Sequence, residues 1–155
     1  MTIPSATEFA TFDAGLEPSV KMLSTSFDGK YFLFNRENEL GVRDRISSTT
    51  LYLGKNAQSG QWSPSANEFV YVTTIDEGIY RHAYSVRLFK TESMTSSELW
   101  RIPYRDYSAG SPAFTPDAKR ISFLSSEGNP ERALYDLWTI DRITDEKQKI
   151  TNFAE

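Results

Sequence analysis

The sequence predicts one all-β domain, and three observations lead to this fold class. The chain has 155 residues, among them 10 Phe, 8 Tyr and 3 Trp, and aromatic residues favour strands. Charged residues make up only 25% of the chain, which is unlike the composition of a disordered protein. The apolar runs, such as 31–34 and 69–72, are short and are bounded by turn residues. We therefore expect an ordered domain built from many short strands.

Charge and residue content exclude several classes of protein. The net charge of −4 and the absence of a Lys/Arg cluster argue against nucleic acid or an anionic membrane as a partner. Cysteine is absent, which excludes disulfides, thiolate metal sites and a cysteine nucleophile. Residues 1–8 lack the basic and apolar regions of a secretory signal. We expect a soluble protein without membrane insertion, cytoplasmic as written or periplasmic if the chain is a processed form.

One ten-residue pattern occurs three times, at 25–34, 62–71 and 114–123. Each copy joins a turn rich in Ser, Thr, Pro, Asp and Gly to an apolar strand, and these turn residues fix the backbone of tight hairpins. A short stretch precedes each turn and two strand-like stretches follow each copy, which makes four strands per repeat. The stretches that follow the copies are 40–45 and 50–53, 83–90 and 98–104, and 134–141 and 148–153.

The spacing of the repeats predicts the architecture. Asp28, Ser65 and Asp117 occupy equivalent turn positions, 37 and 52 residues apart, which brackets the roughly 40–50 residues of a propeller blade. Strands that are apolar on both faces are typical of sheets stacked between neighbours, whereas a barrel or an immunoglobulin-like sandwich would show more alternation. The sequence predicts three four-stranded antiparallel blades of a partial or half β-propeller. Their approximate bounds are 18–56, 57–106 and 107–155, and 1–17 forms an N-terminal edge strand or extension.

The third copy, followed by 136–141 and 149–151, resembles a whole blade of the TolB-like or WD40-like (PD40) β-propeller repeat. The signature of that repeat is an aromatic residue, then Ser-Pro-Asp-Gly-Lys, then an apolar strand. The first copy departs from it at Thr25 and Phe27, and the second at 65–67. Ordinary WD40 repeats fit less well, because no Gly-His or Trp-Asp dipeptide occurs. The same repeat builds TolB, the propellers of prolyl oligopeptidase-like and dipeptidyl peptidase-like enzymes and some polysaccharide lyases, so the resemblance implies no single activity.

Most residues that suggest chemistry have a structural interpretation. Asp28 and Asp117 are expected to close the repeated turns. The aromatic residues Trp62, Phe114 and Trp138 are expected in the blade cores, whereas Trp100 lies on an outer strand that can face solvent. His82 is the single histidine, so one chain cannot build a two-histidine metal site. The sequence has no nucleophile elbow, Walker or Gly-x-Gly-x-x-Gly motif, and we assign it no cofactor, metal or catalytic residue.

The loops between the second and third strands of the blades form the candidate binding face. They emerge at the same end as the connections between blades, and loop-bearing faces commonly bind ligands. Six carboxylates and three arginines lie in these loops, so the face is acidic and suits a basic peptide, a protein or a cation. The candidate partner-binding residues are Glu37, Glu39, Asp76, Glu77, Tyr80, Arg81, His82, Glu127, Asn129 and Arg132.

Two functions remain open at this point. The first is a non-enzymatic propeller module that binds a protein or peptide partner through its loop face. The alternative is half of an assembled propeller enzyme that processes carbohydrate or peptide with paired loop carboxylates, or the propeller fragment of a longer peptidase-like protein. Propellers usually close with about four to eight blades. We therefore expect either a homodimer that completes a six-bladed ring or a part of a longer propeller protein.

Overall fold

The computed structural model describes residues 20–78, 81–102, 109–128 and 134–153. Within these residues it contains three four-stranded antiparallel sheets and no helix, which confirms the predicted fold class.

Each sheet is formed by four strands consecutive in the chain, and we call the sheets blades 1, 2 and 3. Blade 1 contains β1 (Val20–Thr25), β2 (Tyr31–Arg36), β3 (Glu39–Asp44) and β4 (Thr50–Lys55). Blade 2 contains β5 (Gln58–Trp62), β6 (Glu68–Gly78), β7 (Arg81–Lys90) and β8 (Thr95–Ile102). Blade 3 contains β9 (Ala109–Phe114), β10 (Arg120–Ser125), β11 (Asp136–Asp141) and β12 (Lys147–Lys149).

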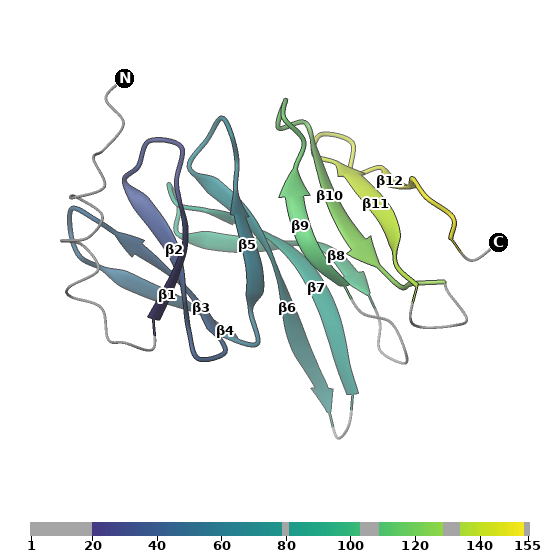
Figure 1. Ribbon diagram of the computed structural model, residues 1–155, viewed down its shortest axis with the longest axis horizontal. Helices are drawn as coiled ribbons and strands as arrows, with labels where there is room; N and C mark the ends of the chain where they lie inside the picture. Colours follow the sequence, from purple (N-terminus) through teal and green to yellow (C-terminus); the bar gives the residue numbers. More distant parts are fainter. Residues whose placement is uncertain (1–19, 79–80, 103–108, 129–133, 154–155) are drawn as a thin grey trace.

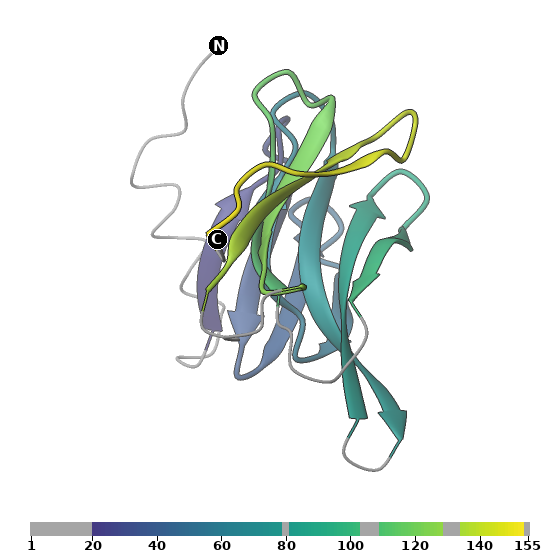
Figure 2. The same cartoon turned by 90° about the vertical axis from the view of Figure 1, so that its right-hand side faces the viewer.

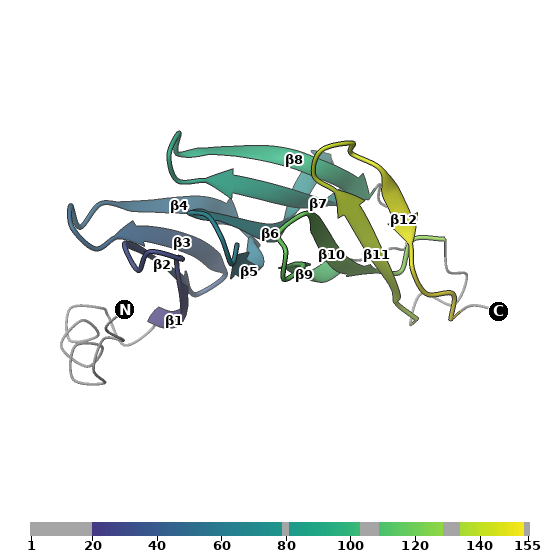
Figure 3. The same cartoon turned by 90° about the horizontal axis from the view of Figure 1, so that it is seen from above.

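The three blades stand side by side like neighbouring sectors of a ring (Figures 1 and 3). The first strands β1, β5 and β9 lie on the inner side, and the fourth strands fan outwards (Figure 3). The predicted edge strand or extension at 1–17 lies outside the described residues. The fourth strands differ from the expected stretches: β8 begins at Thr95 rather than 98, and β12 ends at Lys149 instead of continuing to 153.

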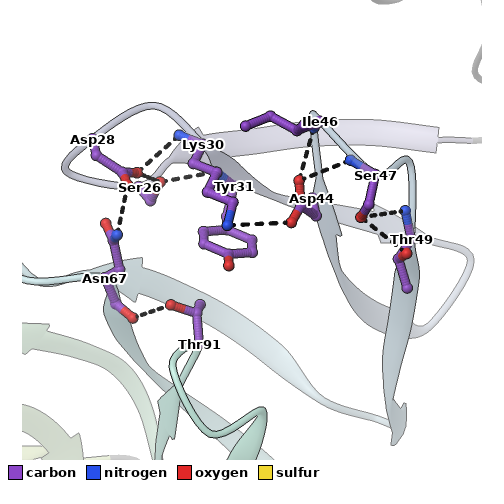
Figure 4. A network of polar contacts seen from close by, with 10 residues as sticks. All are labelled: Ser26, Asp28, Lys30, Tyr31, Asp44, Ile46, Ser47, Thr49, Asn67 and Thr91. Carbon is purple, nitrogen blue, oxygen red and sulfur yellow. Dashed lines mark hydrogen bonds and ion pairs between the residues drawn. The ribbon is translucent and has the colours of Figure 1, made fainter.

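The repeated turns close on aspartate side chains, as predicted for Asp28 and Asp117. Asp28 Oδ1 accepts hydrogen bonds from Ser26 Oγ and from the backbone N–H of residue 30, both at 2.8 Å (Figure 4). Asp117 Oδ1 accepts from Thr115 Oγ1 at 2.7 Å and from the backbone N–H of residue 119 at 3.1 Å. Partial burial raises the pKa of Asp28, but its hydrogen bonds outweigh this, and both aspartates have a pKa below the usual range.

Blades 1 and 2 pack through an apolar junction. Trp62 of β5 stacks on Tyr31 of β2 with ring centroids 6.4 Å apart, and its Nε1–H donates to the backbone oxygen of Ser24 at 3.3 Å. A polar bond joins the two repeated turns, because Asn67 Nδ2 donates to Asp28 Oδ2 at 2.7 Å (Figure 4). The buried residues of this junction are Tyr31, Leu33, Leu40, Val42, Ala57, Trp62, Phe69, Tyr71 and Phe89.

Blades 2 and 3 pack through a second junction that includes the outer strand β8. Trp100 is only 8% exposed and makes edge contacts with Phe123 and Trp138, at centroid distances of 5.0 and 4.9 Å. The expectation of a surface position for Trp100 is therefore wrong. Blade 3 covers one side of the indole ring, and Lys147 Nζ lies 4.7 Å from the centroid of that ring. The buried residues of this junction are Val70, Val72, Val86, Leu88, Trp100, Ile102, Phe114, Ala118, Ile121, Phe123 and Ile140.

Polar contacts also fix blade 3 against blade 2. Arg142 Nη2 lies 2.5 Å from Oε1 of the buried Glu68, and Arg142 Nη1 donates to the backbone oxygen of Ala118 at 2.8 Å. The backbone N–H of Phe114 donates to Gln61 Oε1 at 3.0 Å. Each of these bonds satisfies a group that the junction removes from water.

Candidate functional site

The predicted binding residues lie at the end of the blades where the second strand of each sheet turns into the third. Glu37 is exposed in the β2–β3 turn, where its φ is 56°, and Glu39 is the half-buried first residue of β3. Asp76 and His82 are exposed on β6 and β7, and Glu127 follows β10. Glu77 and Arg81 belong to β6 and β7, but their side chains, like all of Tyr80, Asn129 and Arg132, lie outside the described residues.

Residues 76–78 and 81–82 continue the strands β6 and β7, rather than belonging to the loop expected from the polar residues of 76–82. The strands β6 and β7 have 11 and 10 residues, against 6 in each of β2, β3, β10 and β11. Their distal residues, 73–78 and 81–83, project beyond the rest of blade 2 (Figures 1 and 2). We call this projection the β6–β7 arm. The β-branched residues of 73–75 favour an extended backbone, and cross-strand pairing extends it to the tip.

The arm brings two of the predicted residues together. Asp76 and His82 are direct partners in the β6–β7 register, so their side chains lie on the same face of the arm. Asp76 also shapes the tip, because its Oδ1 accepts the backbone N–H of Gly78 at 3.1 Å, and Gly78 has a φ of 121°. The other predicted carboxylates belong to different blades, because Glu37 and Glu39 lie in blade 1 and Glu127 follows β10 of blade 3.

Glu127, like Glu39, is partly buried. Burial raises the pKa of Glu127, and the nearby Lys147 charge offsets only part of this effect. Its Oε2 has no hydrogen-bond partner among the described residues, although its backbone N–H donates to Ser125 Oγ at 3.0 Å. The protonated form of this carboxylate is therefore favoured more than in an exposed glutamate.

A pocket of about 310 Å³ opens at the base of the arm. Val72, Thr74 and Tyr84 form its walls on blade 2, and Ala109 and Gly110 form its wall on blade 3. The remaining lining residues, just before and within β5, are Asn56 and Ser59. The described lining residues supply hydroxyl and amide groups and include no carboxylate or basic side chain, and hydroxyl and amide groups suit hydrogen bonding to a ligand.

Backbone irregularities create this pocket, and the sequence analysis missed it. Ser59 and Ser111 have φ values of 54° and 51°, and each lies three residues before the aromatic residue that ends β5 or β9. The pairing register shifts beside both serines, as in a β-bulge, which turns a strand away from its neighbour. The available signal is the recurrence of serine at this offset from Trp62 and Phe114 in the second and third repeats.

A second cavity, of about 520 Å³, lies at the opposite end, between the repeated turns of blades 1 and 2. Its wall includes Asp28, Asn67 and Glu68, which already form the bonds between blades described above. Lys30 of the same wall lies 3.6 Å from Asp44 Oδ2 (Figure 4). We attribute this cavity to the turn network that joins the blades.

Comparison with solved structures shows a β-propeller fold. The tricorn protease superimposes with a TM-score of 0.60 at 12% identity, over 86% of this chain and 16% of that protein. An acylaminoacyl peptidase of Pyrococcus horikoshii gives 0.56 at 16% identity, over 86% of this chain and 25% of the peptidase. The β-propeller domain of the Trilobed protease from Pyrococcus furiosus gives 0.55 at 16% identity, over 85% of this chain and 43% of that domain. At these identities the likeness shows the fold alone.

This chain therefore forms three blades of a β-propeller and spans less than half the length of each of these structures. No protein-family model matches the sequence, and no curated protein matches it. Among the described residues, no helix has the length and apolar character needed to cross a membrane.

Proposed function

We propose that this chain is a non-enzymatic propeller module of the TolB-like repeat type that binds a protein or peptide partner. The partner contacts the end of the blades that carries the β6–β7 arm, the adjacent pocket and the acidic residues Glu37, Asp76 and Glu127. The arm is the observation that carries the proposal. A hairpin that projects beyond its own sheet, with exposed polar residues near its tip, offers a partner both backbone and side-chain groups.

The chemistry of the pocket favours binding over catalysis. Its hydroxyl and amide groups suit hydrogen bonds to a peptide, and its described lining residues do not include the paired carboxylates of a glycoside-cleaving site. The carboxylates around it add a negative potential that attracts basic side chains. Cation binding is less favoured, because no cluster of three metal-ligating side chains occurs among the described residues.

A second candidate function is the propeller part of a longer peptidase-like protein. The tricorn protease, the acylaminoacyl peptidase and the Trilobed protease domain favour it, because this chain covers only 16–43% of each. In that setting the same end of the blades would contact a neighbouring domain or guide a peptide. A homodimer that completes a six-bladed ring stays a further proposal, and it is tested below by light scattering.

The test uses nine-residue peptide pools of net charge +3, 0 and −3, labelled with fluorescein, and fluorescence polarisation as the readout. We expect the basic pool to bind, and the double variant Asp76→Asn/Glu37→Gln to bind it at least about tenfold more weakly. The matched control is Glu92→Gln, which removes an exposed carboxylate from the opposite end of blade 2. Equal binding by both variants, or no binding by any pool, would contradict the proposal. Cleavage of the peptides, followed by mass spectrometry, would favour the peptidase alternative.

A further inference from the structure

We infer that the partner binds as an extended strand added to the free edge of β6, with one of its side chains in the pocket at the base of the arm. This inference rests on the proposed function and specifies how the peptide is bound. Strand addition is a common mode of peptide recognition, in which main-chain hydrogen bonds give affinity and pockets for alternate side chains give specificity.

The edge is unpaired because β5 is shorter than its neighbour. The strand β5 pairs with β6 from Trp62, opposite Phe69, to Gln58, opposite Val72, whereas β6 continues to Gly78. Within the described part of the chain, no strand pairs with 73–78 on that side. In blade 1 the first strand reaches the last residue of the second, since Val20 pairs with Arg36. The same holds in blade 3 for Ala109 and Ser125.

The edge is protected against a further strand only near its tip. Natural proteins block exposed edges with charged side chains, proline or a bulge, and the charged residues of this edge, Asp76 and Glu77, are confined to its last three residues. Residues 73–78 contain no proline, and the register is regular up to Asp76, with a shift only between Asp76 and Gly78. A two-stranded ribbon is marginally stable in water, so the arm gains hydrogen bonds and stability when a third strand joins it.

The pocket lies where the side chains of such a strand would point. Side chains alternate between the two faces of a sheet, and Val72 faces blade 3, because it belongs to the buried cluster that contains Phe123. Thr74, two residues further along β6, points the same way and lines the pocket opposite the small residues Ala109 and Gly110. A residue of the added strand that lies opposite Thr74 therefore places its side chain in the pocket. The hydroxyl-bearing lining suits serine or threonine at this position.

Charge defines a second position of the bound peptide. Asp76 is exposed and lies two residues beyond Thr74, so it is on the same face of β6. A lysine or arginine opposite Asp76 would form an ion pair at the rim, which contributes to association rate and specificity. If the added strand runs antiparallel to β6, as β5 does, the basic residue comes first. The bound sequence is then Lys/Arg-x-Ser/Thr.

The experiment uses labelled nine-residue peptides with Lys-Val-Thr fixed at the centre and randomised flanks, and a matched Glu-Val-Thr pool. Two backbone-methylated versions of the Lys-Val-Thr pool carry N-methyl groups either on valine or on lysine and threonine. Because alternate residues of an edge strand point their N–H groups to opposite sides, only one version should lose binding, by at least about tenfold. The Glu-Val-Thr pool should bind more weakly than the Lys-Val-Thr pool.

A shortened-arm variant, in which Asn-Gly replaces 75–83, tests the same edge from the protein side. Asn-Gly forms a two-residue hairpin turn between the paired residues Thr74 and Tyr84, so the pocket walls stay in place. We expect it to bind the peptide at least about tenfold more weakly, with an unchanged far-ultraviolet circular dichroism spectrum. Equal binding of both methylated versions, or full binding by the shortened arm, would overturn strand addition but leave peptide binding intact. Failure of every pool to bind would overturn the proposed function as well.

Discussion

Each blade has one face that is directed towards the next position in the stack. The central side chains of this face differ between blades 1 and 2, where it forms an internal junction, and blade 3, where it is free. At its centre, blade 1 carries the cross-strand pair Leu33 and Val42, and blade 2 carries Val70 and Leu88. All four are buried against the following blade. The equivalent pair in blade 3 is Ser122 and Thr139. Because Ile121 and Ile140 face blade 2, this pair points away from it.

The difference teaches where the stack of blades can be extended. An apolar pair of this kind supplies several kcal/mol when a neighbour covers it, whereas a hydroxyl pair supplies little and must keep its hydrogen bonds. Terminal repeats of repeat proteins generally carry a polar outer face. At this central pair, blade 3 resembles such an end, whereas the next pair on the same face, Leu124 and Leu137, is apolar and partly exposed. A ring closed on this face would therefore need a different central packing from the one that joins blades 1 and 2.

The largest loss of stability is expected when the Ser/Thr pair of blade 3 replaces the apolar pair in the junction between blades 2 and 3. Val70→Ser combined with Leu88→Thr removes buried methyl groups and buries two hydroxyls, so we expect a loss of about 4 kcal/mol in the free energy of unfolding. Urea unfolding followed by tryptophan fluorescence measures it. The exchange Val70→Leu/Leu88→Val keeps the volume and should cost less than about 1.5 kcal/mol. Equal losses in the two variants would show that polarity does not distinguish the junctions.

A smaller loss is expected from the ion pair between blades 2 and 3. Glu68→Gln leaves Arg142 without its charged partner in a largely buried position, and we expect a loss of roughly 1–3 kcal/mol. The exposed control Glu92→Gln should change stability by less than about 0.5 kcal/mol. Chemical denaturation of both variants measures the difference. If Glu68→Gln matched the control, the apolar contacts alone would hold this junction.

The sequence predicted the features that repeat and missed those that occur once. Asp28 and Asp117 were identifiable because turn chemistry is local and the motif recurs. The length of the arm was not, because Asp76 and its polar neighbours have the composition of a loop and only pairing with β7 makes them strand. Trp100 lies on an outer strand, and its burial depends on blade 3 and Lys147. The pocket lies beside Ser59, and a serine alone does not predict the positive φ found there, although its recurrence at Ser111 is a signal.

The stability of blade 3 should depend on pH, because the buried carboxylate of Asp136 binds the outer strand β12 and the residues that follow it. Asp136 Oδ2 lies 2.7 Å from Lys149 Nζ, and Oδ1 accepts from Thr151 Oγ1 at 3.0 Å and the backbone N–H of Phe153 at 2.9 Å. The direct contact with Lys149, followed by the hydrogen bonds from Phe153 and Thr151, holds the pKa of Asp136 below its usual range. The stabilisation is therefore present above the unfolded pKa of about 3.9 and is lost as the pH falls through the lower folded value.

Asp136→Asn should accordingly lower Tm at pH 7, and the difference from the unchanged chain should shrink below about pH 4. Thermal unfolding followed by circular dichroism between pH 7 and 3 measures this. The control is Asp145→Asn in the exposed turn before β12. A difference in Tm that stays constant with pH would show that Asp136 stabilises the fold through packing and not through its negative charge.

Glu127 should show the opposite pH dependence with a smaller amplitude. Because burial raises its pKa, the charged form is less favourable in the folded state, and this cost appears as the pH rises from the unfolded pKa of about 4.3 through the folded value. Glu127→Gln should therefore raise Tm at pH 7 and leave it unchanged near pH 3. The same thermal titration measures it. A lower Tm at pH 7 would show that the charged carboxylate stabilises the fold.

The smallest effect on stability is expected on the free face of blade 3. Ser122→Val combined with Thr139→Leu gives blade 3 the apolar pair of blade 2, and without a neighbouring blade it should change the free energy of unfolding by less than about 1 kcal/mol. Instead it should increase self-association, because an exposed apolar patch favours contact with a second surface.

Light scattering of the unchanged chain and of this variant, over a range of concentrations, separates the two possible roles of the face. A monomer that becomes a dimer only in the variant supports a polar end. If the unchanged chain is already a dimer and Ser122→Arg dissociates it, blade 3 does receive a second copy, and the six-bladed ring gains support. A closed ring would then have to cover the half-buried Ser122 and the already buried Thr139 with hydrogen bonds supplied by the partner, which is a chemistry that neither internal junction uses at this position.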